Sequence, residues 1–486
     1  MKSKPKLHTI SESNISDRMK AENPWWISGF INNEFNELKR RKYFEMFKSL
    51  VEDIDIKRAV VLMGPRRVGK TVMMHHTIQY LLDQKIDRQK ICFLSIDNPI
   101  YNNIGLEQLF SIARKAVAQN DPKGWYVFFD EIQYLKEWER HVKTMVDSYP
   151  HTKFIVSGSA AAALKMSSIE SGAGRMTDFM LPPLTFYEYI YLMGCEHLVY
   201  PVKINWIGNT QNFYSTINHT EFNKHFINYI NYGGYPEVIF SESIRKNPTT
   251  FIKSDIIDKV LLRDLPSLYG IQDIQELNNF FTTLAYNSGN EVSLDALSNE
   301  SGIQKNLIKK YLEYFEAAFL IKKIHRIDDN AKKFKRENYY KIYLTNPSLR
   351  AALFYPITSN DEMTGNMVET AIFSQWMQRD WFIPMYARWT EGRFQGEVDM
   401  VGLSNIKLKP IWAVEIKWSN RFFERPEELK SLLLFCKKNN LNSAMITTLD
   451  KEGEKILEGI TLNFVSSAIY AYVVGENTIK EKQLRT

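Results

Sequence analysis

Residues 58–71 read RAVVLMGPRRVGKT, and this stretch decides the fold of the N-terminal part of the chain. Within it, Gly64 to Thr71 fits the pattern G-x-x-x-x-G-K-[ST]. The apolar run before the motif has the character of a buried strand, and residues 70–84 after it have that of a helix. A glycine-containing bend between strand and helix turns backbone N–H groups toward a phosphate, and the helix N-terminus favours negative charge. The stretch therefore predicts a loop that binds nucleotide phosphates.

The residues of this loop predict ATP with Mg²⁺ as the bound species. Gly64 and Gly69 let the backbone curl around the phosphates. Lys70 is placed to reach the β and γ phosphates, and the Thr71 hydroxyl is placed to ligate Mg²⁺. The predicted ATP-binding segment consists of Gly64, Pro65, Arg66, Arg67, Val68, Gly69, Lys70 and Thr71.

The second half of the ATP site is predicted at the end of another apolar strand. The run 126–129 is followed directly by Asp130 and Glu131. Asp130 would hold Mg²⁺, directly or through water, and Glu131 would act as the general base that polarises the attacking water.

Further polar residues are predicted to sense the nucleotide or complete its site. Ser157 and Ser159 end the next apolar run, and each is either a sensor of the γ-phosphate or a simple helix cap. Arg175 is a candidate arginine finger for the nucleotide of a neighbouring chain. Arg66 and Arg67 are rivals for that charge, and a surface ion pair is the alternative for each arginine. A finger acting on a neighbour would require a homo-oligomer.

The region between residues 58 and 185 alternates short apolar runs with amphipathic stretches. Runs that are apolar throughout are typical of parallel strands covered on both faces, and the alternation predicts an α/β domain with right-handed crossovers. The expected strands are 58–64, 90–96, 125–131 and 153–159, and the expected helices are 70–84, 106–119 and 136–148.

Residues 291–345 follow a different pattern. They predict a helix, a turn at Ser301 and Gly302, a second helix and then strands, which is the order of a winged helix. A local excess of basic residues predicts contact with the phosphates of nucleic acid, most simply DNA. Docking of a protein by a winged helix with solvated lysines is the alternative. The basic residues are Lys305, Lys309, Lys310, Lys322, Lys323, Arg326, Lys332, Lys333, Lys335 and Arg336.

The C-terminal part places acidic residues on neighbouring predicted strands. Glu397 and Asp399 share one face of GEVDMVG, and Glu415 and Lys417 share one face of IWAVEIKW. Asp399 and Glu415 offer hard oxygens to Mg²⁺, and Glu369, on a helix upstream, could complete its shell. Lys417 could orient or deprotonate the attacking water. The alternative is an exposed pair of Glu415 with Lys417 that contributes little.

The motifs resemble those of one family of prokaryotic AAA ATPases over most of residues 38–420. The resemblance is carried by GPRRVGKT, Asp97-Asn98, FFDEIQ, VSGSA, Gly174-Arg175 and PLTFYEY, and by YGGYPEV and GNMVE…GEVDMV…AVEIK in the C-terminal half. The extra strand between the two ATP motifs resembles the plan of AAA+ and related ATPases. The acid on a helix, the Asp on one strand and the Glu-x-Lys on the next resemble the PD-(D/E)xK nucleases. The resemblance implies both folds.

The expected order is therefore a P-loop parallel sheet, a helical and winged-helix part, and a C-terminal α/β nuclease-like domain. The expected boundaries are a tail over 1–33, the ATPase domain over 34–200, the helical and winged-helix domain over 201–345, and the nuclease-like domain over 346–486.

The composition of the chain indicates which partners are possible and which cellular compartment to expect. The net charge of +6 permits nucleic acid as a partner without requiring it. The three cysteines are far apart and form no disulfide pattern, which favours a reducing compartment. No apolar run has the length of a signal peptide core or a membrane span. We therefore expect a cytoplasmic protein without a membrane partner.

Taken together, these patterns predict an ATPase that acts on or with nucleic acid and carries a metal-dependent nuclease site. The alternative is a nucleotide-switched signalling or scaffold ATPase whose nuclease-like domain is inactive. A processive helicase lacks support, since the sequence shows neither a second ATPase lobe nor a strand-separating motif.

Overall fold

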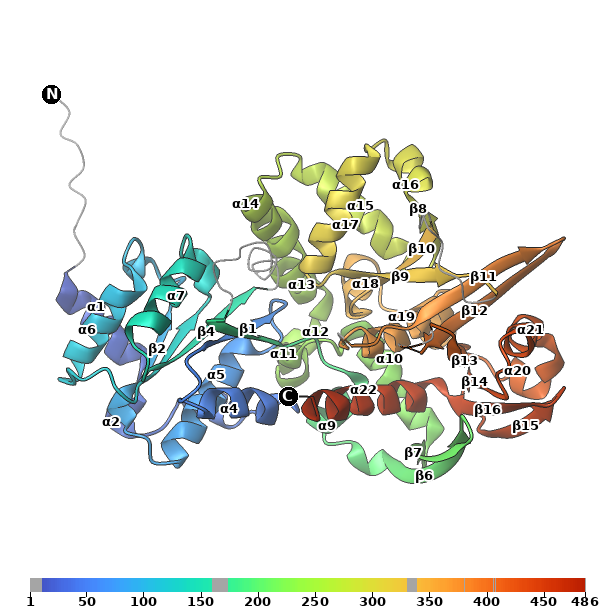
Figure 1. Ribbon diagram of the computed structural model, residues 1–486, viewed down its shortest axis with the longest axis horizontal. Coiled ribbons are helices and arrows are strands. Elements are labelled where there is room, and N and C mark those ends of the chain that lie inside the picture. Colours follow the sequence, from blue (N-terminus) through green and yellow to red (C-terminus); the bar gives the residue numbers. More distant parts are fainter. Residues whose placement is uncertain are drawn as a thin grey trace. The chain divides into compact units, whose positions relative to one another are not determined.

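The computed structural model describes residues 11–159, 174–329, 339–379, 381–404, 406 and 408–485 (Figure 1). The chain divides into two compact units, Met1–Pro182 and Pro183–Thr486. Within the described residues, no helix is both long and apolar enough to cross a membrane.

The N-terminal unit is built around a five-stranded parallel sheet of order β2-β3-β4-β1-β5. Every residue of β1 and β3 is buried, which explains why these strands are apolar along their whole length. Since β4 lies between β1 and β3, the carboxyl ends of all three meet at one edge of the sheet. The strands are β1 (Ala59–Gly64), β2 (Ile91–Ser95), β3 (Tyr126–Asp130), β4 (Lys153–Ser159) and β5 (Met176–Met180).

Helices cover this sheet and close its β2 edge. The segment expected to be a tail is folded over its described residues, 11–33. The Asn23 amide donates to the Phe93 carbonyl at 2.8 Å, and the indole N–H groups of Trp25 and Trp26 donate to the Ile91 carbonyl at 2.9 and 2.8 Å. These bonds occupy backbone groups at the edge of β2 that would otherwise be unpaired. The helices are α1 (Glu12–Glu22), α2 (Trp25–Ser28), α3 (Asn33–Asn36), α4 (Phe44–Glu52), α5 (Lys70–Asp83), α6 (Leu106–Ala116) and α7 (Trp138–Ser148).

The C-terminal unit contains a nine-stranded mixed sheet of order β15-β16-β14-β13-β12-β11-β9-β10-β8. A separate antiparallel hairpin is formed by β6 (Val199–Trp206) and β7 (Asn209–Thr216). The strands of the large sheet are β8 (Glu291–Ser293), β9 (Ile321–Ile327), β10 (Tyr339–Leu344), β11 (Met385–Glu391), β12 (Phe394–Leu403), β13 (Pro410–Glu415), β14 (Ser443–Thr448), β15 (Gly453–Leu457) and β16 (Ile460–Ser466).

The observed units differ from the expected domains at two places. Strand β9 pairs in parallel with β11, with Arg326 opposite Tyr386, so the part expected to end at residue 345 shares its sheet with the part expected to begin there. The expected boundary at residue 200 is also displaced. Phe186 begins helix α9 and packs against Phe226 and Tyr229 of the C-terminal unit. The N-terminal unit therefore ends at residue 182.

Helices pack on both faces of the large sheet and fill two apolar cores. Met400 and Val414 share one core with α19 and α22, whereas Val401 and Ala413 share the other with α21. The helices are α9 (Phe186–Met193), α10 (His219–Tyr232), α11 (Pro236–Phe240), α12 (Glu242–Lys246), α13 (Pro248–Ile252), α14 (Leu265–Tyr269), α15 (Ile274–Tyr286), α16 (Leu294–Ser301), α17 (Lys305–Ala317), α18 (Ser348–Leu353), α19 (Thr364–Trp376), α20 (Arg421–Glu424), α21 (Lys430–Lys438) and α22 (Ser467–Gln483), with π-helical turns at Lys253–Asp258 and Val260–Asp264.

Residues 291–344 adopt the order β8, α16, α17, β9, β10. Gly302, with φ of 74°, ends α16 in the left-handed conformation and lets the chain turn into α17. Strands β9 and β10 then form an antiparallel hairpin. The basic residues Lys332, Lys333, Lys335 and Arg336 lie outside the described residues.

Candidate functional sites

The predicted phosphate loop lies between β1 and α5. Steric and backbone requirements explain why glycine occurs at two of its positions. A Cβ atom on Gly64 would lie 2.2 Å from the Leu181 carbonyl oxygen, so a side chain there would collide with backbone. Gly69 has φ of 92° and immediately precedes the first residue of α5. Arg67 also has a positive φ, 65°, and its side chain is exposed. The loop thus has the sharp curvature that a phosphate cradle requires.

Lys70 lies across the loop that it belongs to. Its ammonium donates hydrogen bonds to the carbonyl oxygens of Gly64 at 3.0 Å and Pro65 at 2.9 Å, and the residue is buried. The ammonium therefore sits above the backbone that would surround the phosphates.

Asp130 receives two side-chain hydrogen bonds at the end of β3. The Thr71 hydroxyl donates to it at 2.7 Å, and the Ser157 hydroxyl donates to its other carboxylate oxygen. Burial, followed by the charge of Glu131, raises the pKa of Asp130, while the hydrogen bonds and Lys70 act in the opposite direction. The two residues predicted to hold Mg²⁺ in this unit are therefore in direct contact. Ser157, predicted as a sensor or a cap, is a partner of the acidic group.

Gln133, which the sequence analysis did not single out, connects the predicted base to the second serine. Its amide N–H donates to the Glu131 carboxylate, and the backbone N–H of Ser159 donates to its side-chain oxygen at 3.1 Å. Glu131 itself has φ of 54° and donates its N–H to the Ser157 hydroxyl at 3.2 Å. This left-handed turn places the acid immediately beside Asp130.

Arg41 is a second residue to which the sequence patterns assigned no role. Its guanidinium is buried and donates to the carbonyl oxygens of Val68 at 2.8 Å and Pro182 at 3.1 Å. Val68 belongs to the phosphate loop, so Arg41 braces that loop from outside it.

Arg175 lies far from the phosphate loop of its own chain. Its carbonyl accepts a hydrogen bond from Ala59, the first residue of β1, whereas the loop follows the last residue of that strand. The Arg175 side chain is exposed and forms an ion pair with Asp147. This geometry gives Arg175 no contact with a nucleotide bound to the same chain.

The C-terminal unit brings three of the predicted residues together. The Lys417 ammonium lies 2.9 Å from Asp399 and 2.9 Å from Glu415. The backbone N–H of Ile416 also donates to Asp399 at 2.8 Å. These contacts follow from the sheet register, since Met400 is opposite Val414 on the antiparallel pair β12–β13.

The electrostatics of the two carboxyl groups differ. Burial acts to raise the pKa of Asp399, but the ammonium groups of Lys417 and Lys341 lower it below its usual value. Burial, followed by the charge of Asp399, raises the pKa of Glu415 to about 7, although Lys417 opposes the shift. The Oε2 atom of Glu415 is buried and has no hydrogen-bond partner among the described residues.

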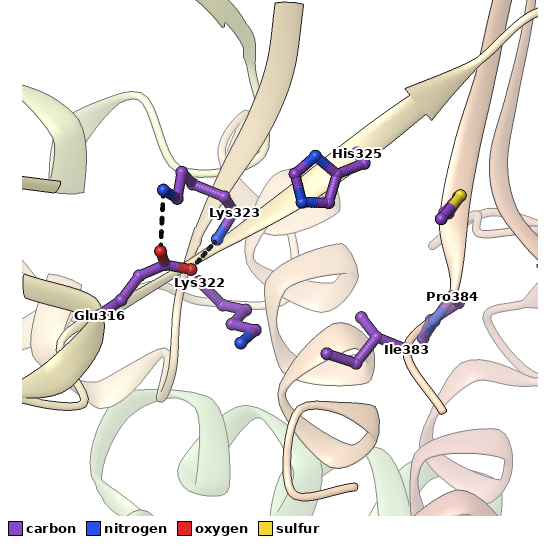
Figure 2. A pocket seen from close by; sticks show the side chains of 7 residues that line it. Glu316, Lys322, Lys323, His325, Ile383 and Pro384 are labelled. Carbon is purple, nitrogen blue, oxygen red and sulfur yellow. Dashed lines mark hydrogen bonds and ion pairs between the residues drawn. The ribbon is translucent and has the colours of Figure 1, made fainter. Parts of the chain in front are cut away.

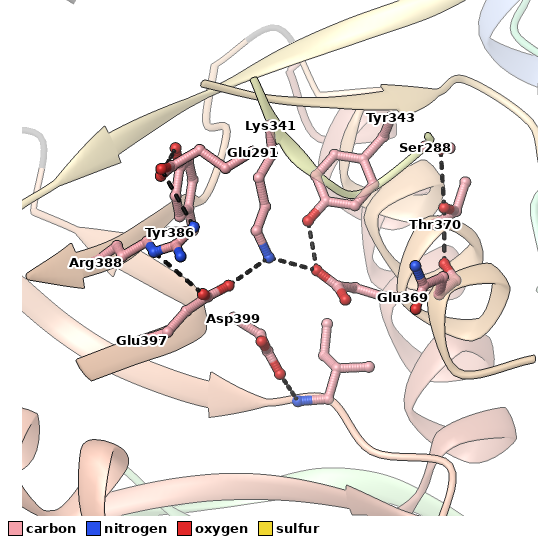
Figure 3. Close-up of polar contacts among 12 residues, drawn as sticks. Ser288, Glu291, Lys341, Tyr343, Glu369, Thr370, Tyr386, Arg388, Glu397 and Asp399 are labelled. Atoms are coloured by element: carbon pink, nitrogen blue, oxygen red, sulfur yellow. Dashed lines mark hydrogen bonds and ion pairs between the residues drawn. The ribbon is translucent and has the colours of Figure 1, made fainter. Parts of the chain in front are cut away.

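Glu369 does not join this group. Its Oε1 atom accepts hydrogen bonds from Lys341 at 3.0 Å and from the Tyr343 hydroxyl at 2.6 Å (Figure 3). The described residues contain no group of three or more His, Cys, Asp or Glu side chains that could hold a metal ion. The predicted metal set of Glu369, Asp399 and Glu415 is therefore not assembled as a group of three.

Asp399 and Glu415 alone are sufficient for a Mg²⁺ site with only two protein carboxylates. Mg²⁺ is commonly bound by one or two carboxylates, with water and substrate phosphate completing its shell. The Glu415 oxygen that has no partner within the described part of the chain is the kind of group that such an ion would satisfy. These two residues would hold the ion, which would supply Lewis-acid stabilisation of a phosphate.

A basic pocket of about 260 Å³ opens beside the first half of β9 (Figure 2). One acidic residue faces three basic ones there, and the Glu316 carboxylate forms an ion pair with Lys323 at 3.0 Å. The lining residues are Glu316, Lys322, Lys323, His325, Ile383, Pro384 and Met385. On the preceding helix, Lys309 and Lys310 are exposed, and Lys305 is paired with Asp295.

Comparisons with known proteins agree with the architecture of the first unit. Residues 56–190 match a family described as an AAA domain, and residues 223–361 match a domain of unknown function. An uncharacterized protein of Methanocaldococcus jannaschii is 26% identical over 420 residues, covering 84% of this chain and 87% of that protein. An uncharacterized protein of Haemophilus influenzae is 24% identical over 436 residues, covering 88% and 97%. The AAA-domain match and the five-stranded sheet with its phosphate loop support an ATP-binding ATPase of the AAA type.

Proposed function

We propose that this protein is a Mg²⁺-dependent ATPase that acts on or with nucleic acid and cleaves it at a metal-dependent site in the C-terminal unit. The observation that carries the nuclease part is the convergence of Asp399, Glu415 and Lys417, with one buried Glu415 oxygen that finds no partner in the part of the chain that the structure describes. ATP binding rests on the phosphate loop and on the contact of Thr71 with Asp130.

In the ATP site, each residue has a separate task. Lys70 would exchange the carbonyl oxygens of Gly64 and Pro65 for phosphate oxygens, which are stronger acceptors for an ammonium. Thr71 and Asp130 would hold Mg²⁺. Glu131, oriented by Gln133, would accept the proton of the attacking water.

The nucleic-acid part of the proposal rests on residues 291–344. We interpret the order of α16, α17 and the β9–β10 hairpin as a winged helix, which places its second helix in the major groove. The exposed Lys309 and Lys310 lie on that helix, and the pocket beside β9 adds Lys322 to the same chain segment. Phosphate contacts of this kind give an affinity that falls steeply with salt.

In the nuclease site, Asp399 and Glu415 would bind the divalent cation, and Lys417 would orient the water that attacks the phosphodiester. The test is Mg²⁺-dependent nicking of supercoiled plasmid by the purified protein. Asp399→Asn and Lys417→Ala should abolish nicking, whereas Lys437→Ala, an exposed lysine paired with Glu458, should leave it intact. Equal nicking by all four proteins would remove the nuclease assignment.

A second function is favoured by one observation. Lys341 and Lys417 between them contact Glu369, Glu397, Asp399 and Glu415, so lysines already partner all four acids. On this basis the chain would be a nucleotide-switched signalling or scaffold ATPase with an inactive nuclease-like unit. Slow ATP turnover with tightly retained nucleotide, and no DNA shift at low salt, would favour it.

We also propose a homo-oligomer in the ATP-bound state. Arg175 is exposed at the edge of the sheet away from its own loop, so it can act as an arginine finger only on a neighbouring chain. Analytical ultracentrifugation with and without ATP tests this. A monomer under both conditions would leave Arg175 as a surface ion pair with Asp147.

A further inference from the structure

We propose that Lys341 is a positioning residue whose ion pair with Glu369 prevents this carboxylate from coordinating a metal ion. The acidic site of the C-terminal unit, formed by Glu369, Glu397, Asp399 and Glu415, would then bind one divalent cation instead of two. The inference rests on the proposed nuclease function. It concerns the number of ions that the site holds and the residue that sets this number.

Lys341 comes from the hairpin strand β10 and reaches into the acidic site. Its side chain is only 6% exposed, and its ammonium lies 3.0 Å from Glu369 and 2.9 Å from Glu397. Figure 3 shows the ammonium between these two carboxylates. The same Glu369 oxygen also accepts the Tyr343 hydroxyl, at 2.6 Å. Two donors from one strand therefore hold this carboxylate in place.

Glu397 also forms ion pairs with basic residues. Besides Lys341, it lies 3.7 Å from Arg388, which in turn lies 3.2 Å from Glu291. Basic and acidic groups thus alternate from Glu369 to Glu291. Among the described residues, Asp399 and Glu415 form no ion pair with this chain of contacts; their common partner is Lys417.

The acidic site therefore has two cation positions that are satisfied in different ways. At one position Lys417 accompanies Asp399 and Glu415, where one carboxylate oxygen has no hydrogen-bond partner among the residues described. At the other position the Lys341 ammonium touches both Glu369 and Glu397. Two-metal phosphodiester sites place a second ion among neighbouring carboxylates, about 3.5–4 Å from the first. The Lys341 ammonium provides the positive charge at that second position.

Removal of Lys341 tests this assignment by ion stoichiometry. We would titrate nucleotide-free protein with Mn²⁺, using electron paramagnetic resonance to count bound ions, in a background of Asp130→Asn that removes the acid of the ATP site. Lys341→Met should bind one Mn²⁺ more per chain than its parent. The double variant Lys341→Met/Glu369→Gln should lose that additional ion, since Glu369 is its proposed ligand.

A matched control distinguishes the freeing of Glu369 as a metal ligand from the simple loss of a positive charge near the site. Arg388→Met also removes a positive charge next to Glu397, but it leaves Lys341 on Glu369. It should bind no additional Mn²⁺. An additional ion in both Lys341→Met and Arg388→Met would overturn the proposal in favour of a general charge effect. The parental ion number in Lys341→Met would overturn it as well.

If Lys341→Met fails to fold, Glu369→Gln in the otherwise native site decides the question. The amide oxygen can still accept from Lys341 and Tyr343, and the first Mn²⁺ should bind with unchanged affinity. A loss of about tenfold or more, typical when a group that supports a metal is removed, would make Glu369 a ligand and overturn the proposal.

If the proposed nuclease function is wrong, the Mn²⁺ titration of the parent protein gives a different result. A parent protein that binds no Mn²⁺ at Asp399 and Glu415 contradicts the nuclease site itself. In that case Lys341→Met still tests whether Lys341 keeps Glu369 from binding metal, because one new ion supports that role and none overturns it.

Discussion

The Thr71 hydroxyl donates a hydrogen bond to the Asp130 carboxylate over 2.7 Å, although the two residues are 59 positions apart in the chain. The contact exists because the strands that precede the two residues end at the same edge of one parallel sheet. It joins the phosphate loop to the acidic strand end, which are the two parts that an ATP–Mg²⁺ complex must touch together.

Replacement of Lys70 by alanine should remove most ATP binding. A hydrogen bond to a charged group contributes about 1.5–3 kcal/mol, so we expect affinity to fall roughly 10- to 150-fold. Equilibrium binding of a fluorescent ATP analogue measures the effect. Lys123→Ala, an exposed lysine of the same unit, is the control. Wild-type affinity in Lys70→Ala would contradict the assignment of the loop.

Glu131→Gln should separate ATP binding from hydrolysis. The amide can keep the contact with Gln133 but cannot accept a proton, and loss of a general base slows a reaction by about 10²–10⁴-fold. Phosphate release should fall by that factor while ATP affinity stays unchanged. Hydrolysis at the parental rate would show that Glu131 is not the base.

Arg41→Ala should loosen the phosphate loop. The substitution leaves the Val68 and Pro182 carbonyl oxygens without a charged donor, which lowers the local free energy of unfolding by roughly 1–3 kcal/mol. Hydrogen–deuterium exchange of the α5 and β1 amides reports this change, and ATP affinity should fall with it. Arg58→Ala, at an exposed position, should change neither quantity. Unchanged exchange in Arg41→Ala would mean that the loop holds its shape without the brace.

The parts of this protein that could be predicted from sequence are those with local patterns. Strands β1 to β4 are apolar runs beside amphipathic helices, and all four occur where the pattern predicted them. Strand β5 was not predicted, since its residues are MTDFM and only Phe179 is buried. The phosphate loop was found because its function fixes residue types at fixed spacing.

The remaining site residues depend on pairing between distant segments. Arg41 reaches Val68 only after α4 and β1 have packed, and no motif marks it. Lys341 meets Glu397 because β9 and β11 pair in parallel with Arg326 opposite Tyr386, a contact that local periodicity does not encode. The same pairing explains why the contact of Lys341 with Glu369 could not be predicted from the sequence. The spacing of the acidic residues could be read from the sequence, but the position of Lys341 between Glu369 and Glu397 in the folded chain could not.

His75 predicts a specific acid sensitivity of the ATPase unit. It lies buried on α5, its ring stacked at 4.1 Å on Phe35 and tilted at 4.7 Å against Phe93. Burial, followed by the charge of His76, lowers its pKa from 6.5 to about 3. Between these values the unfolded chain binds a proton that the folded chain does not, so stability falls as pH falls below 6.5. At pH 5 the loss should be about 2 kcal/mol relative to pH 7.5.

His75→Phe should remove this part of the pH dependence, because phenylalanine preserves the ring packing and cannot be protonated. The measurement is the free energy of unfolding of the N-terminal unit at both pH values, from hydrogen exchange of β1 and β3 amides corrected for intrinsic rates. The substitution should reduce the difference between the two pH values by about 2 kcal/mol. His151→Phe, at an exposed position, should leave that difference as it is in the parent. An equal difference in His75→Phe and the parent would mean that the His75 ring is protonated without local unfolding.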